Sequence, residues 1–381
     1  MKNVFYLAVL CSLLSQLPFV LNSGLDVYFK AVWLFPLLIY THKHISDIFS
    51  SKLMQFYFFL FCFFFYCLLT GALTGKNYIG DDIYNALVCC MFTVSSYLFW
   101  IKYGSIKVLN RLSVIFLIAS LYLSYVVYKE FLVGYSIMSR GYAYDNKNNF
   151  AFMLFACILF SLLNFKSRQK STLILKVVIC TVVTIVIFLL KSRATILGLL
   201  LCVMYLVFKS QDKYLKYGFM ALLSLTVILL VFSSEFYDTF VNGILTAGRD
   251  TSDINDLSSN RISIFQTRLS EFSYDNCMYG IGNVYFDSFP IAIMVQYGII
   301  GFSMVFCFLF KVFRFINKLP RTSNSLYLTT FLLMISLLIN ALFEAYPPFG
   351  PGLKCMIFWI CYGFCLAEHR KKYFLRNLVK Y

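Results

Sequence analysis

Charged residues are scarce in this chain of 381 residues: Asp, Glu, Lys and Arg together make up 13% of it. Soluble proteins carry about 25% charged and about 45–50% apolar residues. Here 60% of the residues are hydrophobic and 19% are aromatic. This composition excludes an ordinary soluble domain and indicates an integral membrane protein.

The alternation of polar and apolar residues that is typical of a membrane β-barrel is also lacking. Long apolar runs take its place, such as FYFFLFCFFFYCLL at 56–69, and such a run covers every face of a helix with apolar atoms. Because a helix satisfies its own backbone polar groups in lipid, we expect an all-α bundle. The sequence has no internal repeat, low-complexity tract or soluble domain, so residues 1–381 are expected to form one polytopic membrane domain.

Hydropathy predicts about twelve membrane spans. Several are short for the ~20 residues that a span needs, so eleven or thirteen also fit. The expected spans are 4–22, 27–41, 53–73, 83–101, 112–128, 149–165, 172–190, 194–208, 214–233, 288–310, 325–343 and 353–367.

The basic residues set the expected orientation. With the N-terminus in the cytoplasm, 22 of the 33 Lys and Arg residues fall in inner segments, which predicts that both termini are cytoplasmic. The net charge of +16 therefore reflects membrane topology and does not indicate nucleic-acid binding. The three histidines, His42, His44 and His369, all fall on the inner side.

Residues 187–201 read IFLLKSRATILGLLL, with Lys191 and Arg193 between two apolar runs. Reading 177–208 as one long helix would reverse the side of everything that follows. A hairpin instead places 12 of the later basic residues inside and 4 outside. An Arg at the middle of the bilayer would also cost about 2.5–3.5 kcal/mol. We therefore expect a tight turn that faces outward at this triplet.

One outer loop, residues 234–287 between the ninth and tenth spans, is far longer than the others. Its NRISIFQTRLSEF segment has apolar residues near helical spacing, which predicts a short amphipathic helix. Its GRDTSDIND segment lacks the ligand spacing, central Gly and closing Glu of a calcium loop. The thirteen cysteines form no CxxC pair and lie mostly in apolar runs, so no metal or cofactor is expected.

The outward cations oppose the topology rule and need another reason for their position. Arg presents a planar fork of donors that suits phosphate oxygens, so Arg193 and Arg261 or Arg268 could converge on one anionic lipid headgroup, although no pattern in the sequence brings them together. The alternative is that they reach toward outer-leaflet phosphates without a specific role. That simpler interpretation is preferred for four others: Lys129, Arg140, Lys147 and Lys354.

Four segments resemble the O-antigen polymerase (Wzy) family, relatives of the O-antigen ligases. They are DNKNNFAFMLF at 145–155, KSRATILGLLL at 191–201, NRISIFQTRL with YGIGN at 260–283, and DSFPIAIMVQYGIIGF at 287–302. Each motif is degenerate, and their order and spacing carry the resemblance. The ligases typically have His-Asn where this chain has Asp287 and Ser288, which favours a polymerase over a ligase.

The resemblance implies transfer of a growing glycan from undecaprenyl pyrophosphate to a lipid-linked repeat unit, on the periplasmic face of the bacterial inner membrane. The resemblance is also compatible with a chain-length regulator protein as a partner. A ligase of the same group, or a polysaccharide flippase or other transporter, remains an alternative. A carrier would be expected to hold polar or charged groups within its spans, and these spans are nearly free of charge.

The resemblance also suggests roles for individual residues. Arg193 and Arg261 would stabilise the leaving pyrophosphate, with Lys191 and Arg268 in support. Asp287 is the candidate base, although a helix cap is an equally good interpretation of it. The other candidates for substrate binding are Arg140, Tyr142, Tyr285 and Glu344. Glu344 could also act as a second base.

Overall fold

The computed structural model describes residues 2–133, 147–210, 213–246, 249, 252–253, 255, 261–321, 324–345, 347–350 and 354–378. All regular secondary structure in these ranges is helical, and no strand occurs in them. The all-α class expected from the sequence is confirmed.

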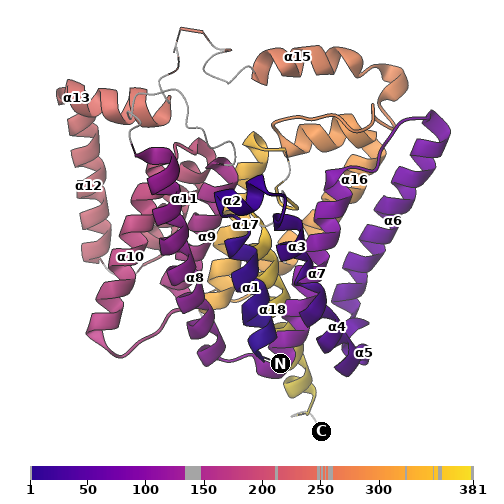
Figure 1. The fold of residues 1–381 in the computed structure, drawn as a ribbon, viewed down its shortest axis with the longest axis horizontal. Coiled ribbons are helices and arrows are strands. Elements are labelled where there is room, and N and C mark those ends of the chain that lie inside the picture. The colour runs from indigo at the N-terminus through magenta and orange to yellow at the C-terminus, as the bar shows by residue number, and fades with distance from the viewer. Residues whose placement is uncertain are drawn as a thin grey trace.

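Most of the helices run between the two ends of a bundle, and α15 lies across the end that is uppermost in Figure 1. The bounds of the helices are α1 Lys2–Leu14, α2 Pro18–Asn22, α3 Asp26–Ala31, α4 Leu34–Lys43, α5 Ile45–Ile48, α6 Ser51–Thr74, α7 Asp81–Tyr103, α8 Ile106–Val127, η1 Tyr128–Leu132, α9 Lys147–Asn164, α10 Lys170–Leu189, α11 Arg193–Lys209, α12 Lys213–Phe232, α13 Ser234–Tyr237, η2 Asp238–Leu245, α15 Arg261–Glu271, η3 Tyr274–Asn276, α16 Phe289–Asn317, α17 Ser325–Phe343 and α18 Met356–Leu378.

Seven of the described helices are long and apolar enough to cross a membrane, namely α6, α7, α8 with η1, α9, α10, α16 and α17. The α12 helix and the segment after it, bent by 108°, make a candidate eighth. Length and composition therefore support seven or eight of the twelve expected spans. The expected spans 4–22 and 27–41 are each divided into two shorter helices, and α11 has only 17 residues.

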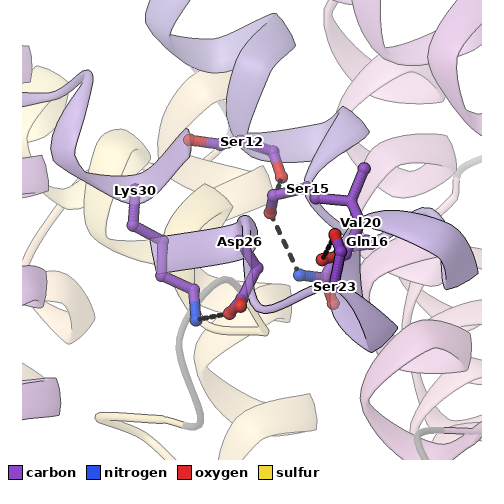
Figure 2. A network of polar contacts seen from close by, with 7 residues as sticks. All are labelled: Ser12, Ser15, Gln16, Val20, Ser23, Asp26 and Lys30. Carbon is purple, nitrogen blue, oxygen red and sulfur yellow. Dashed lines mark hydrogen bonds and ion pairs between the residues drawn. The ribbon is translucent and has the colours of Figure 1, made fainter. Parts of the chain in front are cut away.

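The division of the first expected span has a local cause. Pro18 begins α2, where its missing N–H is tolerated, and Leu17 before it is extended with φ −63° and ψ 135°. Polar side chains satisfy each other and the carbonyl groups near this break. The contacts drawn in Figure 2 are Ser15 Oγ to Ser12 O at 2.8 Å, Gln16 Nε2 to Ser15 Oγ at 3.3 Å, Ser23 Oγ to Val20 O at 3.0 Å, and the Lys30–Asp26 ion pair at 2.5 Å.

Helices α7 and α9 form the centre of the bundle. In their most apolar stretches 83% and 72% of the residues are buried, compared with 33% in α6 and 22% in α10. The α9 helix packs against α8, α17 and α10, while α7 packs along α18. The α9 helix is buried from Phe150 to Ser161, and its first three residues, Lys147, Asn148 and Asn149, are half-buried.

The loop before α16 is held against a kink inside α16. Gly298 interrupts that helix with φ 65° and ψ −172°, a conformation open essentially to glycine. Four backbone hydrogen bonds join the loop to the kink: Ile281 N to Val295 O at 2.9 Å, Gly282 N to Gln296 O at 3.2 Å, Ile299 N to Cys277 O at 2.9 Å, and Ile300 N to Met278 O at 3.4 Å. The YGIGN segment at 279–283, a few residues before Asp287, thus packs on the YGIIG segment at 297–301.

Replacing Gly298 with Ala is expected to destabilise the protein by roughly 3 kcal/mol, because a left-handed backbone and a steric clash add up. A Cβ atom at this position would lie 2.3 Å from the Met278 carbonyl oxygen. The matched control is Gly218→Ala on α12, where an added Cβ meets nothing within 4 Å. Thermal unfolding of the detergent-solubilised variants measures the difference, and equal midpoints would contradict this account of the kink.

Candidate functional site

A cavity of about 480 Å³ lies where the α10–α11 turn, the start of α9, the end of α17 and the start of α15 meet. Five of its described lining residues are cations and one is an acid, so it is strongly positive. The lining residues are Lys147, Asn148, Lys191, Arg193, Ala194, Leu197, Arg249, Arg261, Phe343 and Glu344.

The Lys-Ser-Arg triplet forms the turn between α10 and α11, as the charge count predicts. Lys191 adopts a left-handed conformation with φ 54°, and its backbone N–H donates to Phe188 O at 2.9 Å. Ser192 Oγ donates to Thr195 Oγ1 at 3.0 Å inside the first turn of α11. Only 5% of Lys191 is exposed, although it carries a charge. The turn therefore holds its two cations against the cavity instead of releasing them into solvent.

Three helices begin at this cavity with a basic residue: Lys147 opens α9, Arg193 opens α11 and Arg261 opens α15. The N-terminus of a helix carries a partial positive charge and unpaired N–H groups, so an acid is the favourable residue there. Cations at three such ends repel both each other and the helix dipoles. An anion bound among them would reverse the sign of each of these interactions.

The pKa values of two cations reflect this crowding. Burial lowers the pKa of the Arg193 guanidinium, and the positive charges of Arg249 and Arg261 lower it further. Burial likewise lowers the pKa of Lys191, with a second contribution from Lys147. In both cases the protonated form lacks the hydration that it would have in water and is repelled by nearby like charges. A polyanionic ligand is the species that would relieve both effects.

Arg261 forms an ion pair with Asp287. Its Nε lies 2.9 Å from Asp287 Oδ2, an ion pair whose alignment falls outside hydrogen-bond geometry. The Tyr285 hydroxyl donates to the other carboxylate oxygen, Oδ1, at 2.6 Å. Asp287 is not among the residues that line the cavity. The carboxylate proposed as a base thus contacts Arg261, and Arg261 faces the cavity.

Glu344 is the one described acid that lines the cavity. It caps α17 in an extended conformation, and Asn148 Nδ2 donates to its Oε1 at 2.8 Å. Lys354 lies close enough to Glu344 and Arg261 to interact with both charges. It is 2% exposed, its Nζ has no hydrogen-bond partner among the described residues, and it lies 5.7 Å from the centre of the Phe152 ring.

The structure brings together four of the residues singled out from the sequence, namely Lys191, Arg193, Arg261 and Glu344. Arg140 and Tyr142 lie outside the described residues, and Arg268 lies on α15 with a side chain that is not described. Sequence reasoning missed two lining residues, Asn148 and Arg249, and it gave Lys147, which also lines the cavity, no specific role. The DNKNNF segment at the start of a span was a usable signal for Lys147 and Asn148, while Arg249 had none beyond its outward position.

Among the described residues, no group of three His, Cys, Asp or Glu side chains is placed to hold a metal ion. No family model matches the sequence, and no curated protein matches it. The geometry of the cationic cavity and the four sequence segments quoted above are therefore the basis for a functional interpretation.

Proposed function

We propose that this protein is an O-antigen polymerase, a glycosyltransferase of the bacterial inner membrane. It would transfer a growing glycan from undecaprenyl pyrophosphate to a lipid-linked repeat unit on the periplasmic face. The observation that carries the proposal is the convergence of Arg193 and Arg261, from segments separated by a complete helix, on one cavity with three further cations. A lipid pyrophosphate is an anion of the charge and size that such a cluster suits.

The proposal includes a topology. Twelve spans would place both termini in the cytoplasm, and loop 234–287 would lie in the periplasm between the ninth and tenth spans. The distribution of the 33 basic residues supports this arrangement. The cavity would then open on the periplasmic side, where lipid-linked repeat units are polymerised. A chain-length regulator protein is a further proposed partner.

In the proposed reaction, a hydroxyl oxygen of the acceptor sugar attacks the anomeric carbon of the donor glycan. The bond from that carbon to the pyrophosphate oxygen breaks, and the pyrophosphate leaves with the electron pair. Arg193, Arg261 and the neighbouring cations would stabilise its developing charge, which is the largest contribution that fixed groups can make. The hydroxyl proton would pass to a carboxylate. Asp287, which pairs with Arg261, and Glu344, which lines the cavity, are the two candidate carboxylates.

A lipid carrier also needs an apolar site beside the cations. An apolar cavity of about 440 Å³ lies between α16 and α17, and its lining includes Phe289, Leu338 and Leu342. Phe289 follows Asp287 by two residues, and Leu342 precedes the cavity-lining Phe343 and Glu344. This apolar surface would accommodate the start of the polyprenyl chain while its pyrophosphate lies among the cations.

A deletion strain tests the proposal. Without the polymerase, lipopolysaccharide should carry a single repeat unit instead of a ladder of lengths, and the cloned gene should restore the ladder. Loss of even the single-unit product would indicate a flippase, because no repeat unit would reach the periplasm. Accumulation of lipid-linked polymer without transfer to the lipid A core would indicate a ligase. Either of these outcomes would overturn the polymerase assignment.

A further inference from the structure

Four cations from two helices converge on a second cavity, of about 420 Å³, at the opposite end of the bundle. Lys52 comes from the start of α6, Lys311 and Arg314 come from the last part of α16, and Lys318 is the residue that follows this helix. Asp287, two residues before α16, pairs with Arg261 of the first cavity. Lys311 lies 22 residues further along α16 than Phe289, roughly 30 Å at the helical rise. The two cavities are therefore separate sites.

We call the site around Lys52, Lys311, Arg314 and Lys318 the inner cavity. Its charges gather on one side of the end of α16. Lys311, Arg314 and the C-cap residue Lys318 are spaced three and four apart, and Lys318 keeps a helical backbone conformation, so the three lie on one side of the helix. No acid is among the described lining residues, and none of the four cations forms an ion pair with a described carboxylate. Four like charges around one cavity repel each other unless an anion is present.

The described carboxylates on the flanking elements are already engaged. Asp47 on α5 pairs with Arg370 Nη1 at 2.7 Å and lies 3.3 Å from His44 Nδ1. Glu368 on α18 accepts a hydrogen bond from Trp100 Nε1 at 3.0 Å. These acids hold α5, α7 and α18 together and leave the positive charge of the inner cavity uncompensated. All four cations are exposed, so the inner cavity presents its positive charge to an external ligand.

The lining of the inner cavity also includes apolar side chains, which limits the class of ligand. Phe315 and Leu319 line it together with Gln55, His369 and the cations. Lys52 Nζ lies 5.7 Å from the centre of the Phe315 ring, and the His369 ring packs edge-on against the same ring at 5.5 Å. A small inorganic anion would satisfy the cations and leave this aromatic surface uncovered. A phosphate group with acyl chains attached matches both parts of the cavity.

We propose that the inner cavity binds the headgroup of an anionic phospholipid, with its phosphates among the four cations and the start of its acyl chains on Phe315 and Leu319. Basic pockets between membrane helices on the cytoplasmic side bind such headgroups in other proteins. The bound lipid would hold the ends of α6, α16 and α18 together. This inference is independent of the catalytic proposal, since it requires only that α6 and α16 cross a membrane.

Native mass spectrometry of the full-length purified protein tests this site with added cardiolipin, which carries two phosphates, and with phosphatidylcholine, which carries no net charge. The wild type should retain cardiolipin in preference to phosphatidylcholine. Lys311→Gln combined with Arg314→Gln should weaken cardiolipin binding about 30-fold, given the usual contribution of each cation near a membrane surface. If the double variant does not fold, Lys52→Gln on α6 provides the test instead. This variant should also weaken cardiolipin binding.

The matched control is Lys213→Gln combined with Lys216→Gln, two basic residues of α12 that do not line the inner cavity. This control should bind cardiolipin as the wild type does. Equal cardiolipin binding by both double variants would overturn the proposal, and so would equal retention of the two lipids by the wild type. Displacement of cardiolipin by free pyrophosphate at matching concentration would assign the cavity to a soluble anion and would also overturn it.

Discussion

Cells that carry Arg193→Ala are expected to produce lipopolysaccharide with a single repeat unit while the protein is made at its normal level. Arg193 opens α11 and lines the cavity with four other cations. Removing one donor that stabilises a leaving group lowers turnover by about 10²–10³-fold. Ladder length on silver-stained gels reports the product, and immunoblots of membrane fractions report the amount of protein.

Two further variants sharpen this test. Arg193→Lys keeps the charge and loses the planar fork, so it should restore only part of the ladder. Lys129→Ala removes a cation of η1 that is also expected to face outward but does not line the cavity, and it should leave the ladder unchanged. A normal ladder from Arg193→Ala, or an equal loss from Lys129→Ala, would show that the cavity is not the site of polymerisation.

The second large effect is expected at Arg261, and it decides what Asp287 does. Arg261→Ala should lower turnover by about 10²–10³-fold, for the same reason as at Arg193. Asp287→Asn keeps the shape of the side chain and removes the charge that lies 2.9 Å from Arg261 Nε. Its effect should fall on turnover more than on the apparent affinity for the lipid-linked substrate, both measured with reconstituted protein.

The double variant separates two roles for Asp287. If Asp287 acts by positioning Arg261, then Arg261→Ala with Asp287→Asn should be no slower than Arg261→Ala alone, because the partner that it positions has gone. If Asp287 takes the proton of the acceptor, the two losses should multiply, since loss of a general base alone costs about 10²–10⁴-fold. The ion pair leads us to expect the first result, and multiplying losses would contradict it. Full activity of Asp287→Asn would remove Asp287 from the mechanism.

Some features of this protein follow from local sequence alone. The apolar content of each run determines that it forms a helix that suits lipid, and no distant residue is needed for that result. The turn at the Lys-Ser-Arg triplet was also predictable, because charge bias along the chain distinguishes a hairpin from one long helix. The interruption of the first expected span at Pro18 had a local signal as well, although hydropathy averages over it.

The composition of the cationic cavity was decided only by tertiary packing. Lys147, Lys191, Arg193, Arg249 and Arg261 come from segments spread over more than a hundred residues, and hydropathy describes each segment without reference to the others. The sequence marked Arg193 and Arg261 as outward cations, yet gave no reason for them to meet. Packing of α9 at the centre of the bundle brings Lys147 and Asn148 to the same place.

The contact of Asp287 with Arg261 shows most clearly the difference between what local sequence determines and what packing determines. Its position at the end of a loop and the start of a span is visible in the sequence, which made it a candidate base. Its contact with Arg261 depends on how α15 lies across the bundle, and no pattern of spacing encodes that placement. Residue chemistry therefore determined which groups can act on an anion. The arrangement of the helices determined which of these groups share a site, because only packing brings distant segments within a few ångströms of each other.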